Sequence, residues 1–320
     1  MNKGALLGLA LVAIGIIALV FNSTNQPVFN FFSGSTENIN ETQVVEGEKI
    51  TSIDISASSA GVYLIPTDRD EITIELTGSV SSKLRNSFSL DVDTSRDKLT
   101  VNVKRKSETI KNIFGVVTMN TKLEVYIPEK VYDSISIQTS SGKVSIGDLE
   151  AKSFAVNSSS GSINLSDIIA EKDITVQSSS GRIAVSNSQT KSVSASASSG
   201  SINLDSVVAE TLNVATSSGR IELIECVGTI NAAASSGSIN IDQKQLAGNI
   251  NVSTSSGRVA INIPATSSAI VDFKGSSGKG TVNLTGLVFE EKSNNEVYGK
   301  VGSGDYEIKV RTSSGSFNLN

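Results

Sequence analysis

Residues 174–185 read ITVQSSSGRIAV, and most of the architecture of this chain can be inferred from them. Apolar side chains alternate with polar ones on both sides of a Ser-Ser-Gly motif, at Ile174, Val176, Ile183 and Val185. A period of two is typical of β-strands that bury one face. The segment therefore predicts two short strands joined by a turn at Gly181.

The motif recurs along the chain with nearly constant spacing. Its glycine occupies the following positions: Gly142, Gly161, Gly181, Gly200, Gly219, Gly237, Gly257, Gly278 and Gly315. One repeat cannot bury its apolar face alone, but repeats stacked as parallel strands about 4.8 Å apart can. The pattern predicts an all-β chain that forms a parallel β-solenoid, a β-roll or β-helix of two-strand coils about 45 Å long.

Two further segments are assigned from the same register. Residues 53–64 fit the pattern with Ala60 in the glycine position, and they predict the first coil. Residues 72–127 lack the motif, and their alternating runs predict longer strands that cap the N-terminal end. The solenoid domain thus covers residues 48–320, with the first coil and cap in 48–132 and the Ser-Ser-Gly coils in 133–320. Near the C-terminus, Glu290 to Asn295 is interpreted as a charged insertion within a coil.

The N-terminal region predicts a membrane anchor. Residues 4–21 are uncharged and apolar or small, and a helix of that length spans about 27 Å. The run is longer than the apolar part of most signal peptides, which favours an uncleaved single-pass anchor. Lys3 places residues 1–3 in the cytoplasm and the bulk of the chain outside. Residues 22–47 are interpreted as a juxtamembrane linker whose phenylalanines either rest at the membrane interface or form a short strand on the first coil.

Composition argues against several classes of function. The chain has no histidine, no tryptophan and 5% aromatic residues, so it lacks the usual general base, the commonest metal ligand and the residues that line most ligand pockets. The net charge of −5 disfavours nucleic acid as a partner. Cys226, the only cysteine, takes a position that is apolar in other coils and is predicted to be a buried core residue. We expect no enzyme activity, no cofactor and no metal site.

The turn motif allows two interpretations of its glycines. They adopt a positive φ, or they lie where the backbones of adjacent coils approach closely. In either case, we expect a structural role for the motif serines, whose hydroxyls would satisfy backbone groups of the turn and stack as ladders. Recognition of a ligand along these ladders is the alternative.

A second periodicity follows each glycine, where cations and serines alternate over most of the repeats. The cations are Lys143, Arg182, Arg220, Arg258 and Lys279. One interpretation is a solvated edge whose charges are spaced about 9.6 Å apart to limit repulsion. The other is a stripe that binds an anionic cell-wall polymer. Asparagines at 164, 203, 240 and 318 lie three residues after the glycine in serine-type coils, and they are interpreted as part of a solvated face.

Three segments carry a resemblance to a known family. They are SSAGVYLIPTD at 58–68, LEVYIPE at 123–129 and GSGDYEIKV at 302–310, together with the N-terminal anchor and the Ser-Ser-Gly coils. In this order they resemble the bacterial putative-adhesin family of LiaG-like proteins over about residues 50–320. The resemblance implies a Gram-positive-type envelope protein associated with stress responses, and it supplies no catalytic residues.

The sequence therefore predicts a membrane-anchored extracytoplasmic solenoid that serves as a scaffold or binding protein of the cell envelope. Its partners would be the membrane and an anionic wall polymer or an envelope protein. A polysaccharide-active enzyme and a true surface adhesin are the alternatives. Because no cap follows the final coil, its open edge is expected to allow self-association or to receive a partner.

Overall fold

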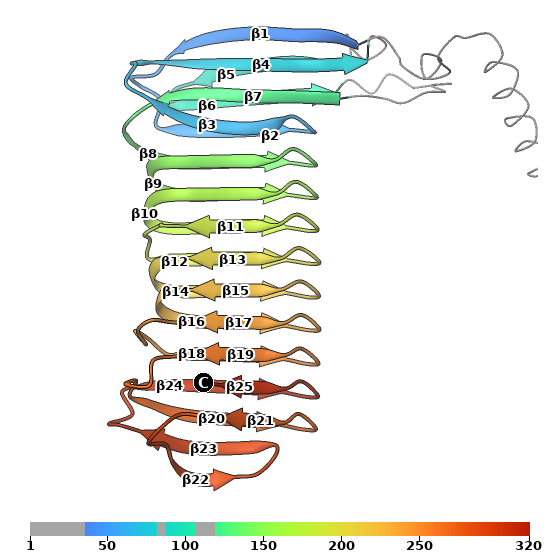
Figure 1. Cartoon of the computed structure of the whole chain (residues 1–320). Coiled ribbons are helices and arrows are strands. Elements are labelled where there is room, and N and C mark those ends of the chain that lie inside the picture. Colours follow the sequence, from blue (N-terminus) through green and yellow to red (C-terminus); the bar gives the residue numbers. More distant parts are fainter. Residues whose placement is uncertain (1–35, 82–87, 106–118) are drawn as a thin grey trace, which may run out of the picture.

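The computed structural model describes residues 36–81, 88–105 and 119–320. The predicted anchor at 4–21 and the phenylalanines of the linker lie outside these residues. No helix in the described part of the chain is long and apolar enough to cross a membrane. The described residues form a long stack of coils with strands on its two broad sides (Figure 1).

The first sheet contains the strands that precede the Ser-Ser-Gly turns, together with the strands that pair with them at the two ends of the stack. Its order is β5 (Phe88–Ser95), β6 (Lys98–Arg105), β2 (Ser52–Ala57), β8 (Val131–Thr139), β9 (Val144–Ser158), β10 (Ile163–Ser178), β12 (Ser192–Ala197), β14 (Val208–Thr216), β16 (Val227–Ala234), β18 (Ile250–Thr254), β24 (Tyr306–Thr312), β20 (Ala269–Gly275), β23 (Glu296–Val301) and β22 (Val288–Lys292).

The strands that follow the turns, again with their end strands, form the second sheet. Its order is β1 (Thr36–Glu46), β4 (Glu71–Ser81), β7 (Met119–Pro128), β3 (Gly61–Thr67), β9, β10, β11 (Ile183–Ser186), β13 (Ile202–Asp205), β15 (Ile221–Ile224), β17 (Ile239–Asp242), β19 (Val259–Asn262), β25 (Phe317–Leu319) and β21 (Gly280–Val282). Strands β9 and β10 are long enough to belong to both sheets. Among the described residues, the interior pairs are parallel, and antiparallel pairs lie only at the two ends. The prediction of an all-β parallel solenoid is confirmed for this part of the chain.

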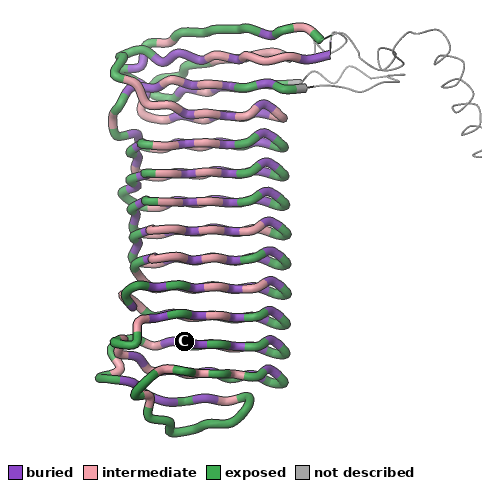
Figure 2. The backbone as a smooth tube through the Cα atoms, viewed as in Figure 1, coloured by how far each residue is buried: buried purple, intermediate pink, exposed green. Residues whose placement is uncertain are grey.

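The core lies between the two sheets and consists of rows of stacked apolar side chains. Figure 2 shows the buried residues at matching positions of successive coils. One row of the first sheet runs Ile135, Phe154, Ile174, Val193, Leu212, Ile230, Ile250, Ile308 and Val271. Every member is at most 2% exposed. Burying such a side chain stabilises the fold by about 1.5–3 kcal/mol, so these rows hold the coils together. Cys226 is 3% exposed, as predicted for a core residue.

Each coil closes at a corner after its second-sheet strand. The corner residue has a positive φ of 49° to 56° at Asp148, Asp167, Asn187, Ser206 and Glu225. Asn and Asp tolerate this left-handed conformation better than most residues do. The polar residues at these corners therefore have a structural role, because they adopt the left-handed conformation in which the backbone turns.

The last coil in the sequence is not the last coil in the stack. Strand β24 pairs in parallel with β18 on one side and β20 on the other, and β25 lies between β19 and β21 (Figure 1). The chain therefore forms the coil of Gly278 first and then returns to insert the coil of Gly315 between the coils of Gly257 and Gly278. The expectation that the final coil presents an open edge is wrong, because both of its sheet edges are hydrogen-bonded.

The return runs through a hairpin that covers the C-terminal end of the first sheet. Glu290 to Lys292 belong to the edge strand β22, and β23 pairs antiparallel with both β22 and β20. The interpretation of 290–295 as an insertion within a coil is therefore wrong. Val297 and Val301 are buried, which explains why β23 packs on the stack while β22 stays exposed.

The N-terminal end has a similar arrangement. Strands β2 and β3 form the coil of Ala60, which lies between β6 and β7 on one side and β8 and β9 on the other. Residues 72–127 provide the capping strands β4 to β7, as the sequence predicted. Residues 36–46, assigned to the linker from sequence, instead form the edge strand β1 against β4. The antiparallel strands at both ends limit the growth of the stack by pairing with further chains.

Candidate functional site

The Ser-Ser-Gly turns stack in close backbone contact along one edge of the solenoid. A Cβ added to Gly219 would lie 1.9 Å from the carbonyl oxygen of Gly200, and one added to Gly200 would lie 2.0 Å from that of Gly181. The same contact joins the turns in the order Ala60, Gly142, Gly161, Gly181, Gly200, Gly219, Gly237, Gly257, Gly315 and Gly278. No motif glycine has a positive φ. Close approach of the backbones, the second of the two interpretations, is what the structure shows.

In five of the nine Ser-Ser-Gly turns, the glycine N–H is satisfied by a hydroxyl three residues before the glycine. The N–H of Gly181 donates to Ser178 Oγ at 2.8 Å, and the N–H of Gly219 donates to Thr216 Oγ1 at 3.1 Å. Gly142, Gly257 and Gly315 make the same bond. The motif serines instead stack through their backbones, and from Ser140 to Ser314 their hydroxyls make no hydrogen bond to described residues. The prediction that their side chains satisfy the turn is wrong, although the recurrence of Ser or Thr at the earlier position was visible in the sequence.

Ser178 and Ser158 provide a matched test of this hydrogen bond. Both side chains are buried at the same position of adjacent coils, but Ser158 Oγ has no hydrogen-bond partner. We expect Ser178→Ala to lower the free energy of unfolding by about 1–2 kcal/mol, because the buried N–H of Gly181 loses its acceptor. Ser158→Ala should leave stability unchanged or raise it slightly. Urea unfolding followed by circular dichroism measures both, and equal effects would contradict the assignment.

The residue after each glycine lies at the start of the second-sheet strand, and its backbone fixes the order of the coils. The N–H of Val144 donates to the carbonyl of Ser162, and the N–H of Ile163 donates to the carbonyl of Arg182, both at 2.8 Å. Near the C-terminal end, the N–H of Val259 donates to the carbonyl of Ser316, and the N–H of Phe317 donates to the carbonyl of Lys279, again at 2.8 Å. The complete spatial order is Lys143, Ser162, Arg182, Ser201, Arg220, Ser238, Arg258, Ser316 and Lys279. Cations and serines alternate without a break in this order, whereas the sequence order places Lys279 directly after Arg258.

We name Lys143, Arg182, Arg220, Arg258 and Lys279 the cation row. All five side chains are exposed. Neighbouring members are two coils apart, which is about 9.6 Å. Among the described residues no carboxylate lies within ion-pair distance of any of them, and Lys143 contacts only the Tyr63 ring, at 5.8 Å from its centroid. The cation row therefore presents five positive charges, none of which forms an ion pair with a described residue.

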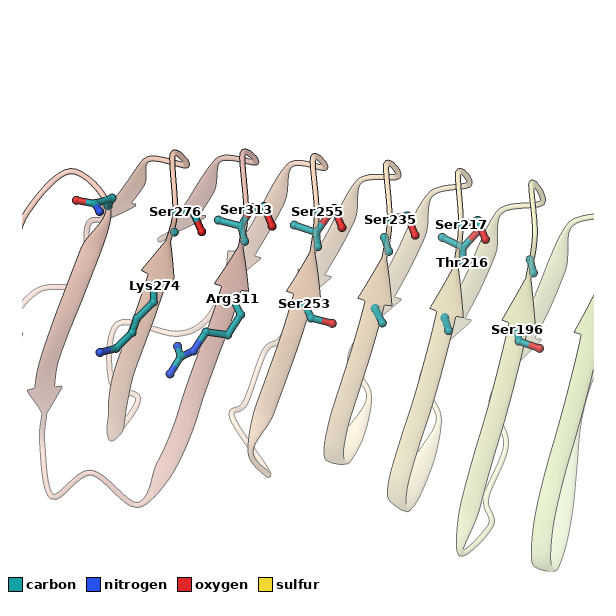
Figure 3. A pocket seen from close by; sticks show the side chains of 18 of the residues that line it. Ser196, Thr216, Ser217, Ser235, Ser253, Ser255, Lys274, Ser276, Arg311 and Ser313 are labelled. Carbon is teal, nitrogen blue, oxygen red and sulfur yellow. The ribbon is translucent and has the colours of Figure 1, made fainter.

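A groove of about 840 Å³ lies on the outer face of the first sheet (Figure 3). Small side chains such as Ser196, Ala215 and Ser253 form its floor, and Lys274 and Arg311 lie at one end. Each of these cations has a carboxylate partner in the chain: Lys274 pairs with Glu296, and Arg311 pairs with Asp272. The hydrogen bond that Lys274 donates to the Glu296 carboxylate raises the pKa of Lys274. The charges of the groove are thus neutralised internally, unlike those of the cation row.

Comparison with known proteins identifies the architecture. Residues 50–320 match the family described as Toastrack DUF4097. The chain belongs to the Toastrack DUF4097 family. No curated protein matches it.

Several solved structures are similar to this Toastrack solenoid. A putative lipid binding protein from Parabacteroides distasonis is 18% identical with a TM-score of 0.51, and the match covers 88% of this chain and 96% of the other. A putative adhesin from the same organism is 11% identical with a TM-score of 0.47, covering 90% and 98%. A putative adhesin from Parabacteroides merdae is 14% identical with a TM-score of 0.45, covering 88% and 96%. At these identities, the first similarity supports the fold alone.

The remaining reactive groups of the Toastrack solenoid do not form a site. Burial raises the pKa of the Cys226 thiol to about 11, so it stays protonated near neutral pH. No group of three or more acidic or sulfur ligands that could hold a metal ion occurs in the described ranges. Of the residues singled out from sequence, the structure brings the five cations onto one edge and the nine motif glycines onto the adjoining backbone stack.

Proposed function

We propose that this Toastrack solenoid is a non-catalytic binding scaffold of the bacterial cell envelope and that its cation row holds an anionic polymer. The observation that carries the proposal is the row of five exposed cations, placed at every second coil and without an ion-pair partner in the part of the chain that the structure describes. A polymer with repeated anionic groups can pair with several of them at once. Weak individual contacts then add up through multivalency.

The N-terminal segment would hold this scaffold at the membrane. In the proposal, residues 4–21 span the bilayer once, with residues 1–3 in the cytoplasm and the solenoid outside. A role in envelope stress rests on the sequence resemblance. The similar solved structures are described as putative adhesins and as a putative lipid binding protein, and a binding role for this chain agrees with both descriptions.

The proposal predicts salt-sensitive binding that depends on the cation row. The full chain in detergent micelles should bind a fluorescent teichoic-acid-type polymer, measured by anisotropy, and the affinity should fall as salt rises. Replacing Lys143, Arg182, Arg220, Arg258 and Lys279 by serine should weaken binding about tenfold or more, because five exposed ion pairs contribute about 0.2–1 kcal/mol each.

A charge-matched variant separates the cation row from net charge. Replacing the exposed residues Lys49, Lys172, Lys191, Lys292 and Lys300 by serine removes as many charges but leaves the row intact. We expect this variant to bind within about twofold of the wild type, since long-range effects of exposed charges are screened. Equal loss in both variants, or none in the cation-row variant, would refute the proposed site. Breakdown of a wall polysaccharide by the purified chain would refute the non-catalytic assignment.

A further inference from the structure

The outer face beside the cation row carries a second pattern with the same two-coil period. The residue three after the glycine is asparagine in every serine-type coil from Gly161 onward: Asn164, Asn203, Asn240 and Asn318. In the cation-type coils, the same position holds Ser145, Ala184, Glu222, Ala260 and Thr281. Because residues two apart on a strand share a face, each asparagine lies on the same face as the serine of its coil. The face therefore alternates one cation with one serine and asparagine pair.

The pattern follows the folded surface and not the order of the chain. Asn318 pairs with Ala260 on one side and Thr281 on the other, so the inserted coil supplies the serine and asparagine that the sequence lacks between Arg258 and Lys279. Repulsion between cations explains why they avoid adjacent coils. It does not explain why asparagine occupies the coils between them.

The asparagine amides are available to a ligand. Asn318 is exposed, and Asn164, Asn203 and Asn240 are partly exposed. The Oδ1 atom of Asn203 is an exception, because it is buried and has no hydrogen-bond partner in the described part of the chain, so this oxygen does not face a ligand. An amide offers both donors and an acceptor, which suits neutral hydroxyl groups better than charges.

The spacing of the cations indicates the spacing of charges on the ligand. Two coils correspond to about 9.6 Å, and an extended chain advances about 1.2 Å per backbone bond, so about eight bonds separate successive anions. We propose that this face binds an anionic polymer with one negative charge per roughly 10 Å and hydroxyl-bearing units between the charges. The proposal rests on the proposed function and adds the chemical class of its ligand.

Two kinds of polymer share this chemistry. A five-carbon polyol-phosphate polymer has eight backbone bonds between phosphorus atoms, with hydroxyls on the carbons between them. An acidic glycan with one carboxylate per disaccharide also separates single charges by hydroxyl-bearing units. A three-carbon polyol phosphate has six such bonds, or about 7 Å, and polyphosphate has charges but no hydroxylated spacer. On the spaced polymers, anions would pair with the cation row while hydroxyls bond the serines and asparagines.

Two variants of the full chain test the spacing and the hydroxyl contacts. The first replaces Asn164, Asn203, Asn240 and Asn318 by alanine, which Ala184 and Ala260 show to be compatible with this position. The second, Ser201→Arg with Arg220→Ser, keeps all five charges but moves one of them by one coil. Binding to the four polymers is measured at equal concentration of charge, with circular dichroism as the check on folding.

We expect the asparagine variant to lower affinity for the pentitol-phosphate polymer or the acidic glycan about tenfold or more, since each lost neutral hydrogen bond contributes roughly a factor of two to ten. The charge-shifted variant should lower affinity for the same polymer about two- to fivefold, since one exposed ion pair no longer matches the spacing of the anions. Binding of polyphosphate should stay within about twofold, because charge alone is screened and insensitive to such detail. The ligand class is identified by which of these two polymers, the pentitol phosphate or the acidic glycan, loses affinity for the variants. If neither variant changes any affinity while the cation-row variant still loses binding, the inference is wrong and the proposed function stands. If the wild type binds none of the polymers, both fail.

Discussion

Replacing Gly219 by alanine is expected to destabilise the solenoid by about 3 kcal/mol or more, the upper range for overpacked sites. The new Cβ would lie 1.9 Å from the carbonyl oxygen of Gly200 and 2.7 Å from its carbon. Both are backbone atoms in the middle of the stack, so neither can move aside without disturbing the neighbouring coils. The strain would be transmitted to both neighbours, because each coil depends on the next.

Gly147→Ala is the matched control for this substitution. A Cβ at Gly147 would lie 3.1 Å from the Ser166 hydroxyl, which is the free end of a small side chain, and 3.7 Å from the Ser166 carbonyl oxygen, which is an ordinary contact. Because glycine within a strand costs about 0.5–1 kcal/mol relative to alanine, this variant should be neutral or slightly more stable. Urea unfolding and hydrogen exchange across β13 to β17 measure the difference. Similar stability of the two variants would show that the turns can separate easily.

Phe317→Ala is expected to lower the free energy of unfolding by about 3–5 kcal/mol, as for other buried phenylalanines. Phe317 is 1% exposed, and its ring stacks on that of Phe273 with 5.1 Å between centroids. The residue lies close to the C-terminus, where chains commonly fray. In this fold, however, β25 lies between β19 and β21, so loss of its side chain weakens two interfaces of the stack.

Phe289→Ala separates this effect from the loss of any aromatic ring near the C-terminal end. Phe289 is 36% exposed on the edge strand β22, and its substitution should cost less than about 1 kcal/mol. Hydrogen exchange should show faster opening of β19 and β20 in Phe317→Ala but not in Phe289→Ala. If Phe317→Ala accelerated exchange only in β25, the last coil would be a frayed end and not an interior layer.

The two-strand coil could be predicted from the sequence, because the signals that define it come from residues close together in the chain. Alternation at Ile174, Val176, Ile183 and Val185 defines the strands, and the turn glycine marks where they meet. The burial of Cys226 followed from its position in the repeat. The hydroxyl three residues before the glycine was not predicted to accept the hydrogen bond of the turn N–H. That role was assigned to the motif serines, because they recur in every repeat. Thr139, Ser178 and Thr216 accept these bonds, but Ala197, Ala234 and Gly275 take the same position in other repeats, so the signal there is weaker.

The sequence predicted the residues of the cation row but not their complete spatial order. The five cations could be named from their position after each glycine, but the alternation with serine broke down after Arg258. It is restored in the structure by the coil of Gly315, which supplies Ser316 between Arg258 and Lys279. The groove with its neutralised cations had no sequence signal, because Asp272 and Arg311 are far apart in the chain.

The repeat by itself determined that this chain stacks parallel coils, because period-two alternation and glycine spacing depend on neighbouring residues alone. Only the tertiary structure decided the order of those coils at the two ends. A coil at the end of the stack and a coil inserted within it have the same local sequence pattern. Which coil takes which place therefore depends on the apolar faces that the hairpin β22–β23 and the strands β4 to β7 can cover. That choice sets the spacing of the charges on the surface.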